Sequence, residues 1–325
     1  MMHGPEKSHS AIRAKKPANN TGRPAAEWVE QRAGTEGNAG QPRTQRTQCR
    51  ASVSPGLDRV RIAAKQRKKE KFTALLHHVT IDLLTEAFLA LKRRAAPGVD
   101  GVTWQDYEAD LESNLASLHE RVQRGTYRAL PSRRKNIPKP DGRVRALGIA
   151  AVEDKIVQRA AVAVLNAVYE EDFLGFSYGF RPKRSQHDAL DALCVAIDRK
   201  KVSWILDVDI RSFFDLLSRD WLVRFLKHRI ADERMIRLVR KWLQAGVLDE
   251  GVWMDSEAGV PQGATASPLL ANVYLHYSFD LWVQQWRKRH ARGDMVVVRF
   301  ADDSVLGFQY KSDAERFLAA NAARQ

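Results

Sequence analysis

The stretch MVVVRFADDSVLGF, Met295 to Phe308, decides how this chain folds. Two apolar runs flank Ala-Asp-Asp so tightly that a β-hairpin with a two-residue turn is the natural geometry. Its tip then carries Asp302 and Asp303, two neighbouring carboxylates that repel each other and are costly to bury unpaired. A divalent cation would offset both charges, and Mg²⁺ favours carboxylates together with substrate phosphates. A solvent-exposed turn, where aspartate is common, is the alternative.

A second acidic segment, ILDVDIRSFFD at 205–215, changes the balance between these two interpretations. A strand places Asp207 and Asp209 on one face, and the apolar residues around them indicate burial. If the end of this strand meets the hairpin tip, three carboxylates converge there. Such a group could hold two Mg²⁺ ions, which together can clamp an in-line phosphoryl transfer. Asp209 is also a candidate N-cap for the turn that follows it.

A third segment, GVPQGATASPLLANVYL at 259–275, begins as a loop and continues as a helix. Its glycines and proline shape a loop whose backbone can approach a ligand closely. The side-chain amide of Gln262 could reach the edge of a base or a sugar. Taken alone, this motif is weak evidence for a binding loop. Its occurrence in this chain order with the two acidic segments makes the combined pattern specific.

The positive charge of the chain is uneven. The formal net charge is +14, and residues 1–100 hold 19 Lys and Arg against 9 Asp and Glu. This distribution favours a polyanionic partner, most simply nucleic acid, although a solvated basic tail that binds nothing gives the same count. The two cysteines make neither a disulfide framework nor a zinc site and fit a reducing cytoplasm. We expect no signal peptide and no membrane span.

Apolar periodicity and turn residues predict an α+β fold. Residues 1–56 have the composition of a disordered basic tail. A basic β-hairpin is expected around a turn at Pro140–Gly142, and a smaller hairpin around Gly251. Thr80 is the expected N-cap of the first helix. Helices are expected over about 80–95, 105–124, 152–170, 186–199, 218–229, 232–245 and 269–289.

In this order, LDVDIRSFFD, GVPQGATASPLLANVYL and RFADDSVLGF resemble the three palm motifs of reverse transcriptases. RRKNIPKPDGRVRALGI, YGFRPKRSQHDAL and PGVDGVTWQDY narrow the resemblance to bacterial group II intron reverse transcriptase/maturases. The resemblance implies right-hand polymerase fingers and palm over 126–325, with an antiparallel palm sheet packed on helices. A helical N-terminal extension over 57–125 would precede them. The family continues with a thumb, so the resemblance implies a chain incomplete at its C-terminus, with the thumb absent.

The resemblance also assigns roles to single residues. Asp209, Asp302 and Asp303 match the catalytic acids and metal ligands, and the Ile210 carbonyl would complete the shell of one ion. The nucleotide-binding positions of the family match Arg133, Lys139, Ile210, Phe214 and Gln262. Phe214 would stack under the sugar and exclude a 2′-hydroxyl, while Arg133 and Lys139 would neutralise the triphosphate. Either template phosphates or solvent would face Arg134, Lys135, Arg143 and Arg145.

The implied activity is RNA-directed DNA polymerisation in a group II intron mobile element, with two Mg²⁺ ions and a possible splicing role. The implied partners are an RNA template, intron RNA, a DNA primer or target, and deoxynucleoside triphosphates. Phe300 and Ala264 depart from the tyrosine and glycine usual in the family, and neither change removes a metal ligand. The alternative is a truncated, non-catalytic fragment that binds intron RNA through residues 57–145.

Overall fold

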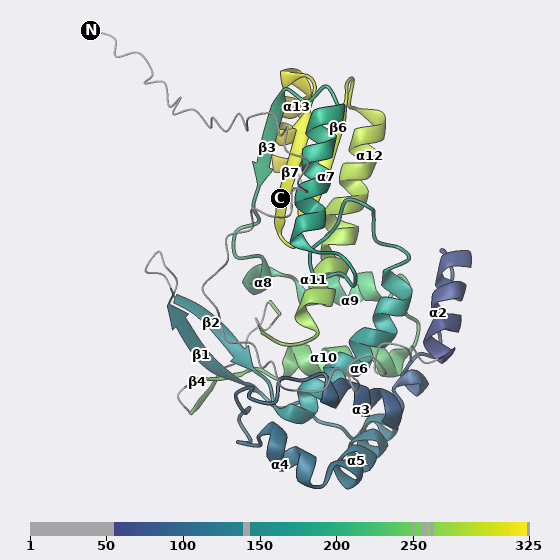
Figure 1. Cartoon of the computed structure of the whole chain (residues 1–325), viewed down its shortest axis with the longest axis vertical. Coiled ribbons are helices and arrows are strands. Elements are labelled where there is room, and N and C mark those ends of the chain that lie inside the picture. The colour runs from purple at the N-terminus through teal and green to yellow at the C-terminus, as the bar shows by residue number, and fades with distance from the viewer. Residues whose placement is uncertain (1–54, 139–143, 250, 255–258, 261–262, 324–325) are drawn as a thin grey trace, which may run out of the picture. The chain divides into compact units, whose positions relative to one another are not determined.

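The computed structural model describes residues 55–138, 144–249, 251–254, 259–260 and 263–323 (Figure 1). The expected basic tail over 1–56 therefore lies outside these residues, except for its last two, which begin a helix. The expected turn at Pro140–Gly142 lies outside them as well. None of the described helices is both long and apolar enough to cross a membrane.

The N-terminal part of the described chain is helical, as the N-terminal extension was expected to be. Thr80 caps α3, because its side chain accepts a hydrogen bond from the amide of Leu83. The single helix expected over 105–124 is instead two helices, which meet at Asp110. The helices up to the middle of the chain are α2 (Pro55–Gln66), η2 (Leu76–His78), α3 (Ile81–Leu89), α4 (Trp104–Ala109), α5 (Leu111–Arg124) and α6 (Val152–Tyr169).

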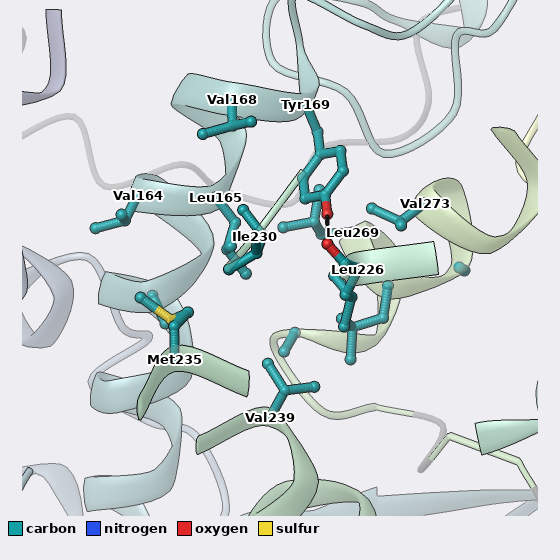
Figure 2. Packing of buried hydrophobic residues seen from close by; sticks show 14 of the residues in the cluster. Val164, Leu165, Val168, Tyr169, Leu226, Ile230, Met235, Val239, Leu269 and Val273 are labelled. Carbon is teal, nitrogen blue, oxygen red and sulfur yellow. Dashed lines mark hydrogen bonds between the residues drawn. The ribbon is translucent and has the colours of Figure 1, made fainter. Parts of the chain in front are cut away.

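Helix α6 is buried on most sides and forms the centre of the core. Figure 2 shows its residues packed against side chains of the helices α9 (Arg219–Leu226), α10 (Glu233–Gln244) and α11 (Ser267–Leu275). The hydroxyl of Tyr169 donates to the Leu226 carbonyl over 3.1 Å, so the one polar atom of this fully buried ring is satisfied. Each large apolar side chain buried in this way stabilises the fold by roughly 1.5–3 kcal/mol.

The expected basic hairpin belongs to a four-stranded sheet with the order β2-β1-β4-β5. Strands β1 and β2 pair in antiparallel register, and β1 also pairs with β4 in parallel. The smaller hairpin expected around Gly251 is confirmed as the antiparallel pair β4–β5. These strands are β1 (Ser132–Pro138), β2 (Val144–Ile149), β4 (Val247–Asp249) and β5 (Val252–Met254).

The second sheet contains both acidic segments. Its order is β3-β7-β6, and both pairings are antiparallel, as expected for the palm. On one face, Trp286 of α12 and Phe317 of α13 pack edge-on and tilted against Phe308. The elements of this layer are β3 (Trp204–Val208), β6 (Met295–Phe300), β7 (Asp303–Phe308), α7 (Gln186–Arg199), α12 (Leu281–Arg289) and α13 (Lys311–Ala322), and Figure 1 shows α7 alongside β6.

One sequence-based expectation about this layer is wrong. Strand β3 is not buried: Trp204 is 43% exposed and Ile205 54%, whereas β6, the other edge strand of this sheet, is buried and is contacted by α7. Ile205 and Asp207 share the face opposite the one that packs on α12 and α13. The helix expected over 269–289 is confirmed, and within it a π-helical turn, His276–Asp280, separates α11 from α12.

Candidate active site

The register of the second sheet brings the acidic residues to one end of it. Val208 pairs with Ser304 across β3 and β7, so Asp209 and Asp303 are the next residues of the two strands at that end. Phe300 pairs with Asp303, which leaves Ala301 and Asp302 as the two residues of the turn. The two-residue turn expected from the apolar flanks is therefore confirmed.

The carboxylates at this end interact electrostatically. Desolvation, followed by the charges of Asp302, Asp209 and Asp207, raises the pKa of the Asp303 carboxyl. The suggestion that Asp209 caps the following helix is wrong, because Ser212 is the N-cap residue of α8 (Phe213–Leu216). Asp209 thus serves no capping role.

The donors at this end suit a hard divalent cation. They are all carboxylate oxygens, and their mutual repulsion is the kind of strain that such an ion relieves. Among the residues that the structure describes, however, no three His, Cys, Asp or Glu side chains form a ready metal-binding group. Asp209 and Asp303 are exposed and Asp302 is half-buried.

The turn itself holds an unusual backbone. Ala301 has a backbone φ of +58°. Residues other than glycine rarely adopt this region, and it costs them about 1–3 kcal/mol. Gly179, from the segment before α7, packs directly on this residue: a Cβ at Gly179 would lie 2.2 Å from the Ala301 nitrogen. The neighbouring Tyr178 amide donates to the Arg299 carbonyl over 2.8 Å. The 176–179 segment therefore supports the turn from the outer edge of β6.

A buried arginine lies under the turn. Arg299 has no exposed surface, and its five N–H groups all have acceptors. These acceptors are the two carboxylate oxygens of Asp280 (2.7 and 2.6 Å), Asn272 Oδ1 (3.1 Å), the Ala301 carbonyl (2.8 Å) and Ser177 Oγ (2.7 Å). Because each bond has a fixed direction, the network holds the Ala301 carbonyl in place.

Asn272 extends this network to the third motif. Its Nδ2 donates to the Gly179 carbonyl over 2.7 Å, while its Oδ1 accepts from Arg299. Helix α11, the hairpin and the 176–179 segment thus meet at one buried asparagine, which is 1% exposed. The residues of this network were not predicted from the sequence. The one signal available there was a charged residue, Arg299, directly after the apolar run MVVV of β6.

The loop of the third motif packs between two other parts of the site. Gly259 has φ of +83°, and a Cβ there would lie 2.6 Å from the Phe214 carbonyl. The amide of Val260 donates to the same carbonyl over 2.8 Å. Gly263, with φ of +98°, approaches the Gly148 carbonyl of β2. The two glycines therefore allow the loop to contact both the segment after Asp209 and the basic hairpin.

The structure places only some of the expected nucleotide-binding residues. Arg133 is half-buried and donates to the Pro97 carbonyl over 2.8 Å. Phe214 is half-buried and lies edge-on to Phe213, with ring centroids 5.4 Å apart. Ile210 packs against the hydrophobic core. Lys139 and Gln262 lie outside the described residues.

The basic hairpin contributes fewer free charges than its sequence suggests. Arg134 forms an ion pair with Asp249 of β4 at 3.2 Å, so its charge is already offset within the sheet. The side chain of Lys135 is exposed. Arg143 lies outside the described residues, as does the side chain of Arg145.

Comparisons with known proteins identify the family. The family model described as reverse transcriptase (RNA-dependent DNA polymerase) matches residues 137–324. Protein YkfC of Escherichia coli (strain K12) is 35% identical in an alignment of 248 residues that covers 67% of this chain and 65% of YkfC. The group II intron-encoded protein LtrA of Lactococcus lactis subsp. cremoris is 31% identical over 238 residues, 73% of this chain and 39% of LtrA. The chain thus spans less than two thirds of either relative.

Among solved structures, a chain of a partial Cas6-RT-Cas1–Cas2 complex is similar with a TM-score of 0.44 and 20% identity. The match covers 74% of this chain and 39% of that one. This likeness is too low to bear on function. The family match over more than half of the chain carries the assignment: the chain belongs to the reverse transcriptase family of RNA-directed DNA polymerases and is related to group II intron-encoded proteins.

Proposed function

We propose that this chain transfers deoxynucleotides onto a primer 3′-hydroxyl under the direction of an RNA template, as part of a group II intron mobile element. The observation that carries the proposal is the register of β3 and β7, which brings Asp209 to the end of the sheet that holds Asp302 and Asp303. The raised pKa of Asp303 supports it, since the charges of Asp302, Asp209 and Asp207 contribute to this shift after desolvation.

The reaction forms one bond and breaks another. The primer 3′-hydroxyl gives up its proton to solvent, its oxygen bonds to the α-phosphorus, the bond from that phosphorus to the bridging oxygen breaks, and pyrophosphate leaves. Two Mg²⁺ ions, when bound, would lower the pKa of the primer hydroxyl and neutralise the triphosphate and the leaving pyrophosphate. Asp209, Asp302, Asp303 and the Ile210 carbonyl are the groups that would hold them.

The remaining residues would orient the nucleotide. Phe214, five residues after Asp209, would stack under a deoxyribose and exclude a 2′-hydroxyl. Gln262 would border the nascent base pair. Lys139 and Arg133 would face the triphosphate, and Arg133 would first have to release the Pro97 carbonyl.

The proposed partners follow from the family and from its named relatives. A reverse transcriptase binds template and primer, here an RNA template and a DNA primer or target. Because LtrA is named as a group II intron-encoded protein, we extend the proposal to intron RNA and to a role in splicing.

Primer extension on poly-rA/oligo-dT with Mg²⁺ tests the proposal. The assay uses protein in excess over primer and measures the addition of a single nucleotide. It therefore does not depend on processive synthesis. We expect extension by the wild type. We expect Asp302→Asn to lower the rate by at least about 100-fold, comparable to the loss of one preorganised transition-state contact.

The matched control is Asp191→Asn, an exposed acid on α7 outside the second sheet, which should extend like the wild type. Extension that survives Asp302→Asn would overturn the assignment of the site. Absence of extension together with RNA binding that survives Asp302→Asn would instead favour a non-catalytic RNA-binding role.

A further inference from the structure

A hollow of about 260 Å³ lies outside the candidate active site, between the C-terminal end of α5 and helix α10, both labelled in Figure 1. No strand of the β3-β7-β6 sheet lines it. Its apolar lining residues, Leu76, Val122 and Leu238, are each at most 5% exposed. The hollow therefore combines an apolar floor with an open rim, and we call it the basic hollow for the charges described next.

The rim of the basic hollow carries four cationic side chains, and of the described residues that line it none is acidic. The cations are Arg124, Arg234, Arg237 and Lys241. Within the described part of the chain only Arg124 forms an ion pair, with Glu120 on the same helix, although the charge of Arg237 also helps to lower the pKa of the Glu233 carboxyl. Both members of that pair are largely exposed, so it contributes little.

The cations of this region repel each other. Burial, together with the charges of Arg237 and Arg128, lowers the pKa of the Lys241 ammonium. Arg234 and Arg237 are exposed and, among the described residues, their guanidinium groups form no ion pair. An anion in the basic hollow would reduce this repulsion further than solvent does.

The walls of the basic hollow are tied together by hydrogen bonds between distant segments. Lys241 donates to the carbonyl of Gly125 over 2.7 Å, which fixes α10 to the end of α5. Asp232, the N-cap of α10, accepts from the amide of Leu76 over 2.9 Å. Gln123 donates to the carbonyl of Leu76 over 3.1 Å. The backbone that carries the cationic rim is therefore held in place by contacts within the chain.

We propose that the basic hollow binds the phosphodiester backbone of a single RNA strand, with phosphates on Arg234 and Arg237. Guanidinium groups match phosphate oxygens in a two-bond fork. The apolar floor suits a base splayed from a single strand, as unpaired RNA permits. The choice of RNA rests on the proposed function; the preference for a phosphate diester rests on the rim itself.

Binding of a fluorescent 20-nucleotide single-stranded RNA tests this site, without Mg²⁺ and without nucleotides so that catalysis plays no part. The variant Arg234→Gln/Arg237→Gln removes both charges from the rim. We expect its Kd to rise about 10-fold and the slope of log Kd against log salt to fall by roughly 1–2. The charge-matched control Arg240→Gln/Lys288→Gln, exposed and outside the hollow, should change the Kd less than about twofold.

Three further arms make the result decisive. Arg234→Lys/Arg237→Lys keeps both charges and should retain affinity within about threefold, and a thermal melt checks that every variant is folded. A DNA strand of the same sequence should lose affinity in parallel, because a phosphate contact does not read the 2′-hydroxyl. Inorganic phosphate at millimolar concentration should not displace the RNA, since a single free ion cannot replace several contacts.

An RNA Kd unchanged by Arg234→Gln/Arg237→Gln overturns the proposal. So does a loss confined to DNA, or displacement by inorganic phosphate, which would make the hollow a site for small anions. Failure of the proposed polymerase function can be distinguished from failure of this proposal. If only the polymerase function fails, primer extension is absent in every protein, while RNA binding still depends on the two arginines.

Discussion

Arg299 and Asp280 form a two-bond ion pair in which neither side chain is exposed to solvent. Arg299 lies in β6, directly before the turn that carries Asp302, and Asp280 ends the π-helical turn. Two charges removed from water are tolerated because every donor of the guanidinium is satisfied. The pair connects the helical layer to the acidic turn.

Removal of one partner should therefore be costly. We expect Arg299→Met to lower the free energy of unfolding by about 3–5 kcal/mol, because Asp280 is left as an uncompensated buried charge. Urea denaturation monitored by circular dichroism measures it. Arg61→Met, which breaks the exposed pair with Asp58, is the control and should cost less than about 1 kcal/mol. Equal losses in the two variants would contradict the role given to burial.

Substitution of Gly179 should disturb the acidic turn. Gly179→Ala would place a Cβ 2.2 Å from the Ala301 nitrogen, so the backbone must move, at a cost of about 1–3 kcal/mol. We expect a lower midpoint in urea and weaker primer extension. Gly175→Ala in the same segment is the matched control, since a Cβ there meets no atom within 4 Å and φ is ordinary. It should be neutral or slightly stabilising.

The charge coupling at the acidic end can be measured directly. We expect Asp209→Asn to lower the pKa of Asp303, because the Asp209 carboxylate is one of the groups that raise it. Titration of the Asp303 side-chain carboxyl by carbon-13 NMR measures the change. Saturating Mg²⁺ should lower this pKa in the wild type as well, since a cation favours the ionised form. Asp191→Asn should leave it unchanged, and a response equal to that of Asp209→Asn would refute the arrangement.

The buried carboxyl of Asp154 should make the free energy of unfolding depend on pH. Burial raises the pKa of this carboxyl to about 6, against hydrogen bonds from the Tyr127 hydroxyl and the Leu130 amide. Between pH 4 and 6 the unfolded chain has lost this proton and the folded chain retains it. Stability due to Asp154 is therefore full below pH 4 and declines as the pH rises to 6, by on the order of 3 kcal/mol in total.

Comparison with Asp154→Asn isolates this effect from the other titrating groups. The unfolding free energy of the wild type minus that of the variant should fall between pH 4 and 6 and stay level above about pH 7. Urea denaturation at four pH values measures the difference. A difference that is flat or rises over this range would contradict the raised pKa.

Local rules in the sequence were sufficient for most single elements. Apolar flanks predicted the two-residue turn at Ala301–Asp302, and Thr80 was recognised as a cap because a cap depends on residues a few positions away. Where the local pattern was ambiguous the predictions erred. The apolar content of β3 indicated burial, but exposure depends on which other elements cover a strand: β3 and β6 are both edge strands, and only β6 is buried.

The sequence by itself determined the family and the α+β class and predicted the three acids, because ordered motifs and short-range periodicity are properties of the chain alone. Only the tertiary structure decided that Ser177, Asn272 and Asp280 converge on Arg299, and that Arg133 is bonded to Pro97. The physical reason is separation along the chain. A buried ion pair or a cationic hollow joins residues up to more than a hundred positions apart, and no local preference specifies which distant partners meet.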